Sequence, residues 1–379
     1  MALEKVWACD TITGARKGLI QVSSFPWDKR MNEASSSQSI VIPARANAAQ
    51  GVNVHQLITS RSTTLVYEDS RGVVAARIVD NPEYDWTTGD LTVATVDLWD
   101  VLAGRLAVQY GSALVTSKLT YQNITWGTLA SALIRNAMPS MFAGYALPIV
   151  TPDSVPGTGW DGVRTYYGYE IPNLVDALRD IMEVEGGPDI DFHPRWAGGF
   201  VPDATGGFYT AGALVWDARI GDLNRDTQVL SFHLDADDNG LTGLKYAQDG
   251  ARVVTNAYAV GEGSEKKLLV RSARNTAPTV PAVDRVVARK SEKSTQALLS
   301  IASEALRVSQ TPTRQLTLTM PRDLPPQKDI IPTHLRLGDR VKIINPSDPG
   351  LPGGTSVWRV IQTSGDIART DVTVVCQPV

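Results

Sequence analysis

The chain has 379 residues, of which 43% are hydrophobic and 20% charged, which is ordinary for a folded globular protein. Its formal net charge of −4 argues against a dedicated nucleic-acid-binding protein, because such proteins usually carry a basic patch or stripe. Neither a signal peptide nor an apolar run of the ~20 residues that span a bilayer is visible, so we expect a soluble protein made in the cytoplasm. At roughly 100–200 residues per domain, this length predicts between two and four domains.

The chain contains two cysteines, Cys9 and Cys376, near its opposite ends. They allow one disulfide at most, and nothing in the sequence brings their Cα atoms together. We expect two isolated buried thiols, because free cysteine packs as a small hydrophobe. The low cysteine count is typical of folding in a reducing compartment.

The first third of the chain consists mainly of short segments with strand character. The candidates are rich in β-branched and aromatic residues and are separated by turn-forming residues; they are residues 6–10, 18–24, 61–68, 72–80 and 90–97. Three strands at this spacing predict an antiparallel meander, and residues 98–103 form one helical turn after it. We therefore predict a small β-barrel domain over residues 1–118.

Two amphipathic helices are predicted in the middle of the chain. The first follows a Thr125 N-cap, with apolar residues at spacings of three and four, and ends before Pro139. The second starts near Pro172 and ends at Gly186. With strand candidates at 189–192, 213–220 and 228–234, these helices predict an α+β domain over residues 119–239.

The last third returns to strand character, with one helix at about residues 294–309. The strand candidates alternate apolar and polar residues, which places one face on a core; they are residues 241–248, 251–261, 267–272, 314–320, 340–344, 357–363 and 371–376. We predict a second β-barrel domain over residues 240–379. The fold class is mainly β with an α+β insert: two small antiparallel β-barrels flank an α+β domain.

One strand candidate carries a cluster that invites a metal or acid–base interpretation. Asp189, Asp191 and His193 alternate, so they share one face of a strand. Such a face is usually exposed, and no third ligand is visible in the sequence. We favour an exposed strand face and keep a metal or acid–base site as the alternative.

The segment from Asp235 to Gly240 matches the opening D-x-D-x-N-G of a calcium loop. Such a loop requires a bidentate glutamate at its twelfth position, and this position is Tyr246. Asn239 and Gly240 also suit a turn between strands, because both tolerate positive φ. We favour the turn, and calcium binding remains the alternative.

The sequence contains no motif that indicates catalysis. It has no H-E-x-x-H zinc site, no G-x-S-x-G nucleophile elbow, no Walker loop and no complete dinucleotide fingerprint. We therefore predict no enzymatic activity, no catalytic residue, no metal and no cofactor.

Nine tryptophans are scattered along the chain, and most are expected to fill cores. Trp27, Trp86 and Trp160 lie in predicted loops rich in glycine and proline. Aromatic side chains are enriched at protein interfaces, so these three are the candidates for contacts with other subunits or partners.

The C-terminal strands resemble the last barrel of phage tail-hub proteins. The similarity lies in the L-G-D-R-V segment at residues 337–341, the V-W-R-V-I strand at 357–361 and the closing strand at 371–376. The hairpin with Asp10 and Gly14, the meander and the turn at Trp99 are similar to the first barrel of minor tail proteins of actinobacterial siphophages. The helix at 171–185 and the following G-G-P-D are similar to their α+β domain.

This resemblance implies a baseplate-hub-like structural protein of the virion tail. Its relatives form homotrimers in which two barrels per subunit build a ring of six similar domains. Such a ring adapts the sixfold tail tube or distal tail ring to a threefold tip and encloses the DNA exit channel. The implied partners are a distal tail protein, a tape measure protein and further tail-tip or fibre proteins, with no membrane segment and DNA only as passing cargo.

Two other functions remain open. A tail-associated cell-wall hydrolase is suggested by the acidic segments at residues 189–193 and 235–238. A carbohydrate- or receptor-binding tail module is suggested by the tryptophans in loops.

Overall fold

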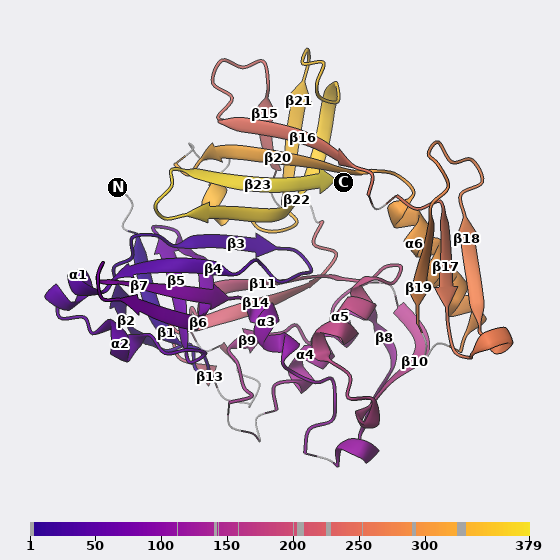
Figure 1. Ribbon diagram of the computed structural model, residues 1–379, viewed down its shortest axis with the longest axis horizontal. Helices are drawn as coiled ribbons and strands as arrows, with labels where there is room; N and C mark the ends of the chain where they lie inside the picture. The colour runs from indigo at the N-terminus through magenta and orange to yellow at the C-terminus, as the bar shows by residue number, and fades with distance from the viewer. Residues whose placement is uncertain are drawn as a thin grey trace.

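The computed structural model describes residues 4–379 apart from residues 112, 140–141, 143, 158, 200, 203–207, 225–228, 252, 290–292 and 324–330. The chain folds mainly into strands, which form several separate sheets, as the predicted class requires (Figure 1). Within the described residues, no helix has the length and apolar composition that crossing a membrane requires.

A six-stranded antiparallel sheet, called the first sheet, holds most of the N-terminal strands in the order β2-β1-β5-β6-β7-β4. These strands are β1 (Lys5–Asp10), β2 (Arg16–Ile20), β4 (Gln38–Pro43), β5 (Thr63–Asp69), β6 (Gly72–Asp85) and β7 (Asp90–Val96). The predicted meander is confirmed, because β5, β6 and β7 pair antiparallel in chain order. The helices α1 (Ala44–Ala49) and α2 (Val54–Leu57) follow β4, and α3 (Leu98–Ala103) follows β7.

The chain that leaves β2 reaches the opposite edge of the first sheet. Ser23 donates its N–H to the carbonyl of Val41 in β4 at 2.8 Å, and Ser24 accepts from the N–H of Val41 at 3.1 Å. The sheet is therefore strongly curled. The strand orders of the described residues nevertheless form open paths, so the prediction of two closed barrels is not confirmed.

The C-terminal sheet recruits strands from all parts of the chain. Its main path is β15-β21-β22-β23-β20-β16, and β3 pairs with β22 outside this path. The strands are β3 (Pro26–Arg30), β15 (Val229–His233), β16 (Gly243–Asp249), β20 (Thr313–Pro321), β21 (Arg340–Asn345), β22 (Gly354–Asp366) and β23 (Asp371–Pro378). Both β3 and β15 lie before residue 240 in the chain. The division into three domains at residues 118 and 239 stays a prediction.

The middle of the chain combines helices with small sheets. Helix α4 (Trp126–Asn136) begins after Thr125, whose hydroxyl accepts from the N–H of Thr128 at 3.1 Å, so the predicted N-cap is confirmed. Helix α5 (Leu174–Met182) is capped by Asn173, one residue after the predicted start. The strands are β8 (Lys118–Thr125), β9 (Ile149–Val150), β10 (Gly159–Tyr167), β11 (Asp189–Trp196), β12 (Val201–Pro202), β13 (Phe208–Tyr209) and β14 (Leu214–Gly221).

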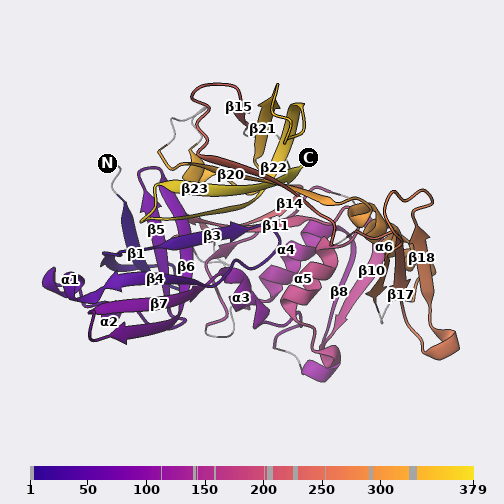
Figure 2. The same cartoon turned by 45° about the horizontal axis from the view of Figure 1, so that its top comes forward.

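Residues 256–309 form a small unit at one end of the long axis of the molecule, called the outlying unit (Figures 1 and 2). It contains β17 (Asn256–Val260), β18 (Val270–Arg274), β19 (Asp284–Ala288) and the predicted helix, α6 (Thr295–Ser309). Its three strands make a sheet of their own, with β17 in the centre. The last third of the chain therefore contains two separate sheets.

The first sheet lies between two hydrophobic cores. Leu65 and Tyr67 of β5 point into a core that is shared with the C-terminal sheet, and Val66 points into a core that is shared with α4, α5 and β11. Successive residues of a strand face opposite sides. Because a core lies on each side of β5, all three side chains are fully buried. Cys376 lies in the first core and Cys9 in the second, and both are buried free thiols, as predicted. The three large parts of the chain thus pack around one central sheet.

Candidate functional site

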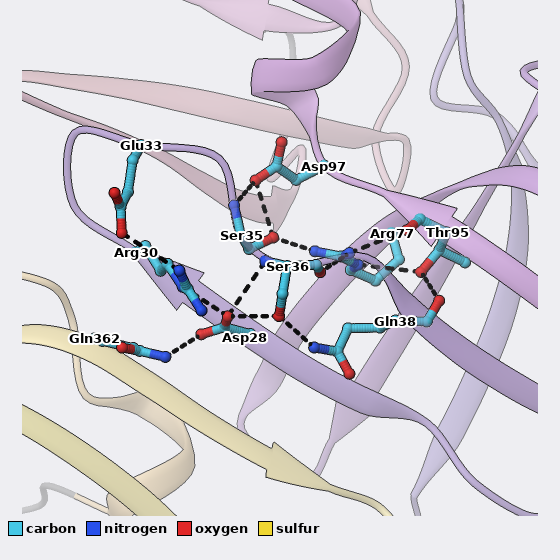
Figure 3. Close-up of polar contacts among 10 residues, drawn as sticks. All are labelled: Asp28, Arg30, Glu33, Ser35, Ser36, Gln38, Arg77, Thr95, Asp97 and Gln362. Atoms are coloured by element: carbon cyan, nitrogen blue, oxygen red, sulfur yellow. Dashed lines mark hydrogen bonds and ion pairs between the residues drawn. The ribbon is translucent and has the colours of Figure 1, made fainter. Parts of the chain in front are cut away.

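A network of polar groups, centred on the buried side chains of Asp28, Ser35 and Arg77, lies where the first sheet meets the C-terminal sheet, and we call it the seam (Figure 3). Its residues come from β3, from the loop between β3 and β4, from β6, from the N-terminus of α3 and from β22; they are Asp28, Arg30, Ser35, Ser36, Arg77, Asp97 and Gln362.

Arg77 is the centre of the seam. It stands in β6, where its side chain is only 2% exposed. Its Nη2 donates to the carbonyl oxygens of Ser36 at 2.8 Å and Thr95 at 3.2 Å, its Nε donates to the Thr95 hydroxyl, and its Nη1 donates to the Ser35 hydroxyl. Burial lowers the pKa of Arg77, and the nearby carboxylates of Asp97 and Asp28 oppose this shift. The guanidinium therefore holds the β3–β4 loop against the first sheet.

Asp97 fixes the same loop from the other side. Its carboxylate accepts from the hydroxyl and the N–H of Ser35, and it also caps α3 in a reciprocal capping box with Asp100. Burial raises the pKa of this carboxyl group. One acidic side chain thus joins the start of a helix to the loop that Arg77 holds.

Asp28 connects the seam to the C-terminal sheet. It is 6% exposed and accepts from Gln362 Nε2 at 2.8 Å, from Arg30 Nε at 2.8 Å and from the Ser36 hydroxyl at 3.1 Å. Gln362 stands in β22, opposite Arg30 in the β3–β22 ladder. A side-chain hydrogen bond and the backbone ladder therefore both join β3 to β22, a strand more than 300 residues later in the chain.

The predicted exposed face of Asp189, Asp191 and His193 is wrong, because this face of β11 is largely buried against other strands. Asp189 accepts from Arg359 of β22 at 2.8 Å, and Asp191, which is 7% exposed, accepts from Arg219 of β14 at 2.9 Å. The alternation indicated which side chains share a face, and the partners of that face come from distant strands. Asp189 therefore connects the middle of the chain to the C-terminal sheet, whereas Asp191 pairs with the neighbouring strand β14.

Burial shifts the titration of two bases beside these ion pairs. It lowers the pKa of His193 from 6.5 to about 2, and the charges of Lys29, Arg336 and Arg219 act in the same direction. It also lowers the pKa of Lys29 to about 8, although Asp191 opposes that shift. Another noncovalent contact between distant segments joins His334 to the end of β5. The Nε2 atom of His334 is 2.7 Å from Asp69 Oδ1.

The L-G-D motif forms the tight turn before β21. Gly338 has φ +94°, and a Cβ atom there would lie 2.0 Å from the carbonyl oxygen of Leu223. Asp339 is 3% exposed and accepts from the N–H of Arg336 at 2.9 Å, while Leu337 is buried in the shared core. Each residue of the motif has a structural role: Gly338 packs on the chain after β14, Asp339 closes the turn, and Leu337 fills the shared core.

A cation–π contact joins the first sheet to the middle of the chain. The guanidinium of Arg16 lies 4.4 Å from the ring centroid of Trp7 and 3.9 Å from that of Trp196. Both indole N–H groups donate to the carboxylate of Glu68, at 2.7 and 2.8 Å. The periodicity of the sequence gave no sign of this arrangement, because its members come from four separate strands or turns.

The three tryptophans predicted as contact residues occupy different environments. Trp27 is 2% exposed and packs in the shared core, whereas Trp86 is 78% exposed at the tip of the β6–β7 hairpin. Trp160 lies in β10, opposite Ile124 of β8, and its side chain is outside the described part of the structure. Contact between these tryptophans and another protein stays a prediction.

The segment from Asp235 to Gly240 forms a turn after β15, the interpretation that the sequence favoured. Asp235 accepts from the hydroxyl of Ser347, and Gly240 has φ +74°. Over the ranges that the structure describes, no three His, Cys, Asp or Glu side chains gather as a metal site.

The openings around the seam are small or polar. A cavity of about 50 Å³ lies between Lys29, Arg77, Asp97 and Asp191, and a polar groove of about 410 Å³ is lined by residues of β3, β20, β22 and β23 and by Ser36 and Gln38. The seam carboxylates accept hydrogen bonds from arginine, serine or glutamine side chains. The arrangement is suited to holding three parts of one chain in a fixed relation.

Searches against protein-family models and against curated proteins found no match. Among solved structures, the tail protein from Neisseria meningitidis MC58 matches with a TM-score of 0.57 at 12% identity, over 99% of this chain and 96% of that chain. The 43 kDa tail protein of prophage MuSo2 from Shewanella oneidensis gives 0.56 at 11% identity, over 99% and 98%. Prophage tail protein gp18 from Listeria monocytogenes EGD-e gives 0.52 at 10% identity, over 98% and 94%. At these identities the likeness is one of fold: the chain has the fold of these phage tail proteins over nearly its whole length.

Proposed function

We propose that this chain is a structural component of a phage tail tip and forms the hub of that tip. The observation that carries the proposal is the likeness of fold to three phage tail proteins, which extends over 98% or more of the chain. A match of this extent includes the first sheet, the middle region, the C-terminal sheet and the outlying unit together. It therefore supports a role for the whole assembly of parts and not for a single shared domain.

In this role three copies form a ring that adapts the sixfold tail tube or distal tail ring to a threefold tip and surrounds the DNA exit channel. Two curled sheets per copy supply six related surfaces, and three copies of a duplicated surface satisfy six equivalent contacts. The partners are a distal tail protein, a tape measure protein and tip or fibre proteins. The tail of an actinobacterial siphophage is the setting that the motifs of the sequence suggest.

The seam supports this role physically. An adapter must keep its two sheets at a fixed angle while neighbouring proteins bind to either side. Arg77, Asp97 and Asp28 connect the sheets through partly buried hydrogen bonds, and such networks stabilise one arrangement when every member has a partner. The two sheets also share one hydrophobic core, so a change in their angle would open that core.

Mass measurement and imaging test the proposal. The purified chain is expected to give a species of three times 40.9 kDa, and images of it are expected to show a threefold ring with six similar lobes. Addition of tail tubes from particles that lack the hub should yield tubes with this ring at one end. A chain that stays monomeric at every concentration and does not bind tail tubes would contradict the proposal.

A second assay separates the structural role from the hydrolase alternative. Purified chain is incubated with host cell wall, and the soluble fraction is analysed for muropeptides. We expect none, because Asp189 and Asp191 are engaged in ion pairs with Arg359 and Arg219. Release of muropeptides that disappears in the Asp191→Asn variant would contradict a purely structural role.

A further inference from the structure

Two segments of opposite charge lie toward the two ends of the molecule, whose long axis is horizontal in Figure 1. One end holds the tip of the β6–β7 hairpin, residues 80–90, which we call the acidic hairpin. The carbonyl of Gly89 accepts from the N–H groups of Ala44 and Arg45, so the hairpin tip lies against the start of α1. The outlying unit lies at the opposite end (Figures 1 and 2).

The acidic hairpin combines carboxylates with exposed aromatic rings. It contains four carboxylates and no lysine or arginine. Glu83 and Asp85 are exposed and have no ion pair among the described residues, whereas Asp80 pairs with Arg61. Trp86 is 78% exposed and Tyr84 37% exposed. An indole this exposed on a turn, with carboxylates around it, is a feature of contact surfaces.

The outlying unit has the complementary charge. Its segment 265–289 holds six basic residues against two acidic ones, a net charge of +4, in a chain whose total is −4. Arg289 pairs with Asp180 and Glu183. The remaining five, which are Lys266, Lys267, Arg271, Arg274 and Arg285, are exposed and form no ion pair within the described ranges.

The sheet of the outlying unit also has an exposed apolar face. Ala257 and Ala259 are fully buried on the side of α6, so Tyr258 and Val260 point to the other face. Their neighbours in register are Val270 of β18, which is 37% exposed, and Val286 of β19, which is 65% exposed.

Arg274 lies on this face, in register with Asn256, whereas Arg271 and Arg285 are in register with Ala259 and Ala257 and therefore lie on the side of α6. Lys266 and Lys267 come just before β18. Apolar side chains with Arg274, Lys266 and Lys267 around them match an indole with carboxylates around it.

We infer that the acidic hairpin of one copy binds the exposed sheet face of the outlying unit of the next copy. The two surfaces lie at opposite ends of one molecule, so they meet only between copies. Contact between two different surfaces is heterologous, and repetition of such a contact closes into a ring or continues as a filament. Like ends repel each other, which disfavours a twofold dimer through either end. The inference rests on the proposed function, because it names the surfaces through which the proposed ring closes.

Charge reversal at each end tests the contact. The first variant is Asn81→Lys with Glu83→Lys, which replaces the unpaired Glu83 by a cation and changes the net charge of residues 80–90 from −4 to −1. It leaves Asp85 unaltered, because the side chain of Asp85 accepts from the N–H of Thr87. The second is Lys267→Glu with Arg274→Glu, two exposed residues of the outlying unit, and the third combines all four changes. The matched control is Lys245→Glu with Arg314→Glu, two exposed residues of the C-terminal sheet.

The dissociation constant of the oligomer, measured by native mass spectrometry or light scattering, is expected to rise at least ~10-fold in each reversed variant, since like charges across an interface repel. It is expected to return toward the wild-type value in the fourfold variant and to stay unchanged in the control. Rescue by the fourfold variant cannot arise from repaired folding, because the exchanged charges lie at opposite ends of each molecule. Trp86→Cys with Val286→Cys is expected to form disulfides between copies, since both native cysteines are buried.

The outcomes separate the inference from the proposed function. An oligomer whose mass and affinity are unchanged by both reversals contradicts the inference and leaves the proposed function intact. The inference is also contradicted if both double variants weaken the oligomer and a folded fourfold variant does not restore its affinity. The inference and the proposed function are both contradicted if the wild-type chain remains monomeric and the double-cysteine variant forms no disulfide between copies.

Discussion

The seam and the outlying unit contain arginines in similar sequence patterns but in opposite environments. Arg77 stands in V-V-A-A-R-I-V and Arg285 in V-D-R-V-V-A, and both patterns indicate a strand. Arg77 lies between two packed sheets and is 2% exposed, whereas Arg285 is exposed on an edge strand. The difference arises from what packs on the strand, and local sequence does not record that.

The two regions also differ in the size of their cores. The first and C-terminal sheets share a core that includes Trp27, Phe25, Tyr67 and Trp358. The outlying unit buries Ala259, Leu298 and Ala302 as its cluster among the described residues. A large core with buried ion pairs keeps one geometry, while a small unit with exposed charges is free to change its surface. Structure and contact with other copies are therefore expected to depend on different residues.

The largest expected effect is on the seam. Arg77→Met removes the donor to the Ser36 carbonyl and to the Thr95 hydroxyl, and it removes the cation whose charge stabilises the Asp97 carboxylate. We expect the free energy of unfolding to fall by about 3–5 kcal/mol in urea denaturation, because the loss of one charge leaves a carboxylate of opposite charge uncompensated in a poorly solvated site. Arg285→Met is the matched control and is expected to stay within about 0.5 kcal/mol of wild type. If Arg77→Met and Arg285→Met lowered the free energy of unfolding equally, the seam would be no more important for stability than the outlying unit.

Sequence periodicity predicted the elements that depend on local patterns. Helix α4 with its Thr125 cap, the β5–β7 meander and the turn after β15 follow from spacing and turn residues alone. Periodicity could not predict that β3 pairs with β22, because the Asp28–Gln362 contact spans 334 positions in the chain. It also placed Asp189, Asp191 and His193 on one face but could not identify the arginines that cover that face. A charged residue inside an apolar strand, such as Arg77, was the available signal for the seam.

Glycine substitutions give the second largest effect. Gly338→Ala forces a Cβ atom to within 2.0 Å of Leu223 at a φ of +94°, and Gly263→Ala brings one to 2.3 Å from the carbonyl oxygen of Lys267 at +113°. We expect Gly338→Ala to lower the free energy of global unfolding by about 1–3 kcal/mol, because its turn anchors the shared core. Gly263→Ala is expected to reduce hydrogen-exchange protection within residues 256–309 alone. Loss of protection across both sheets in Gly263→Ala would mean that the outlying unit is not energetically separate.

At neutral pH the smallest expected effect is that of His193, which adds a pH dependence to the seam side of the molecule only in acid. Burial, with the charges of Lys29, Arg336 and Arg219, lowers the pKa of His193 from 6.5 to about 2. Below pH 6.5 the unfolded chain therefore binds a proton at this residue, and the folded chain does not. The stability that His193 contributes is complete above pH 6.5 and falls by about 1.4 kcal/mol per pH unit below it.

His193→Gln removes this titration, so its free energy of unfolding is expected to fall less steeply than that of wild type between pH 6.5 and 4.5. Burial raises the pKa of Asp191 and of Asp339, and these groups act in the opposite direction, because they take up protons in the folded state as the pH falls. They are present in both proteins, so the difference between the two curves isolates His193. Urea denaturation at several pH values measures it. Parallel curves would mean that His193 binds its proton equally well in the folded and unfolded chain, and that solvent reaches this face of β11 as it reaches the outlying unit.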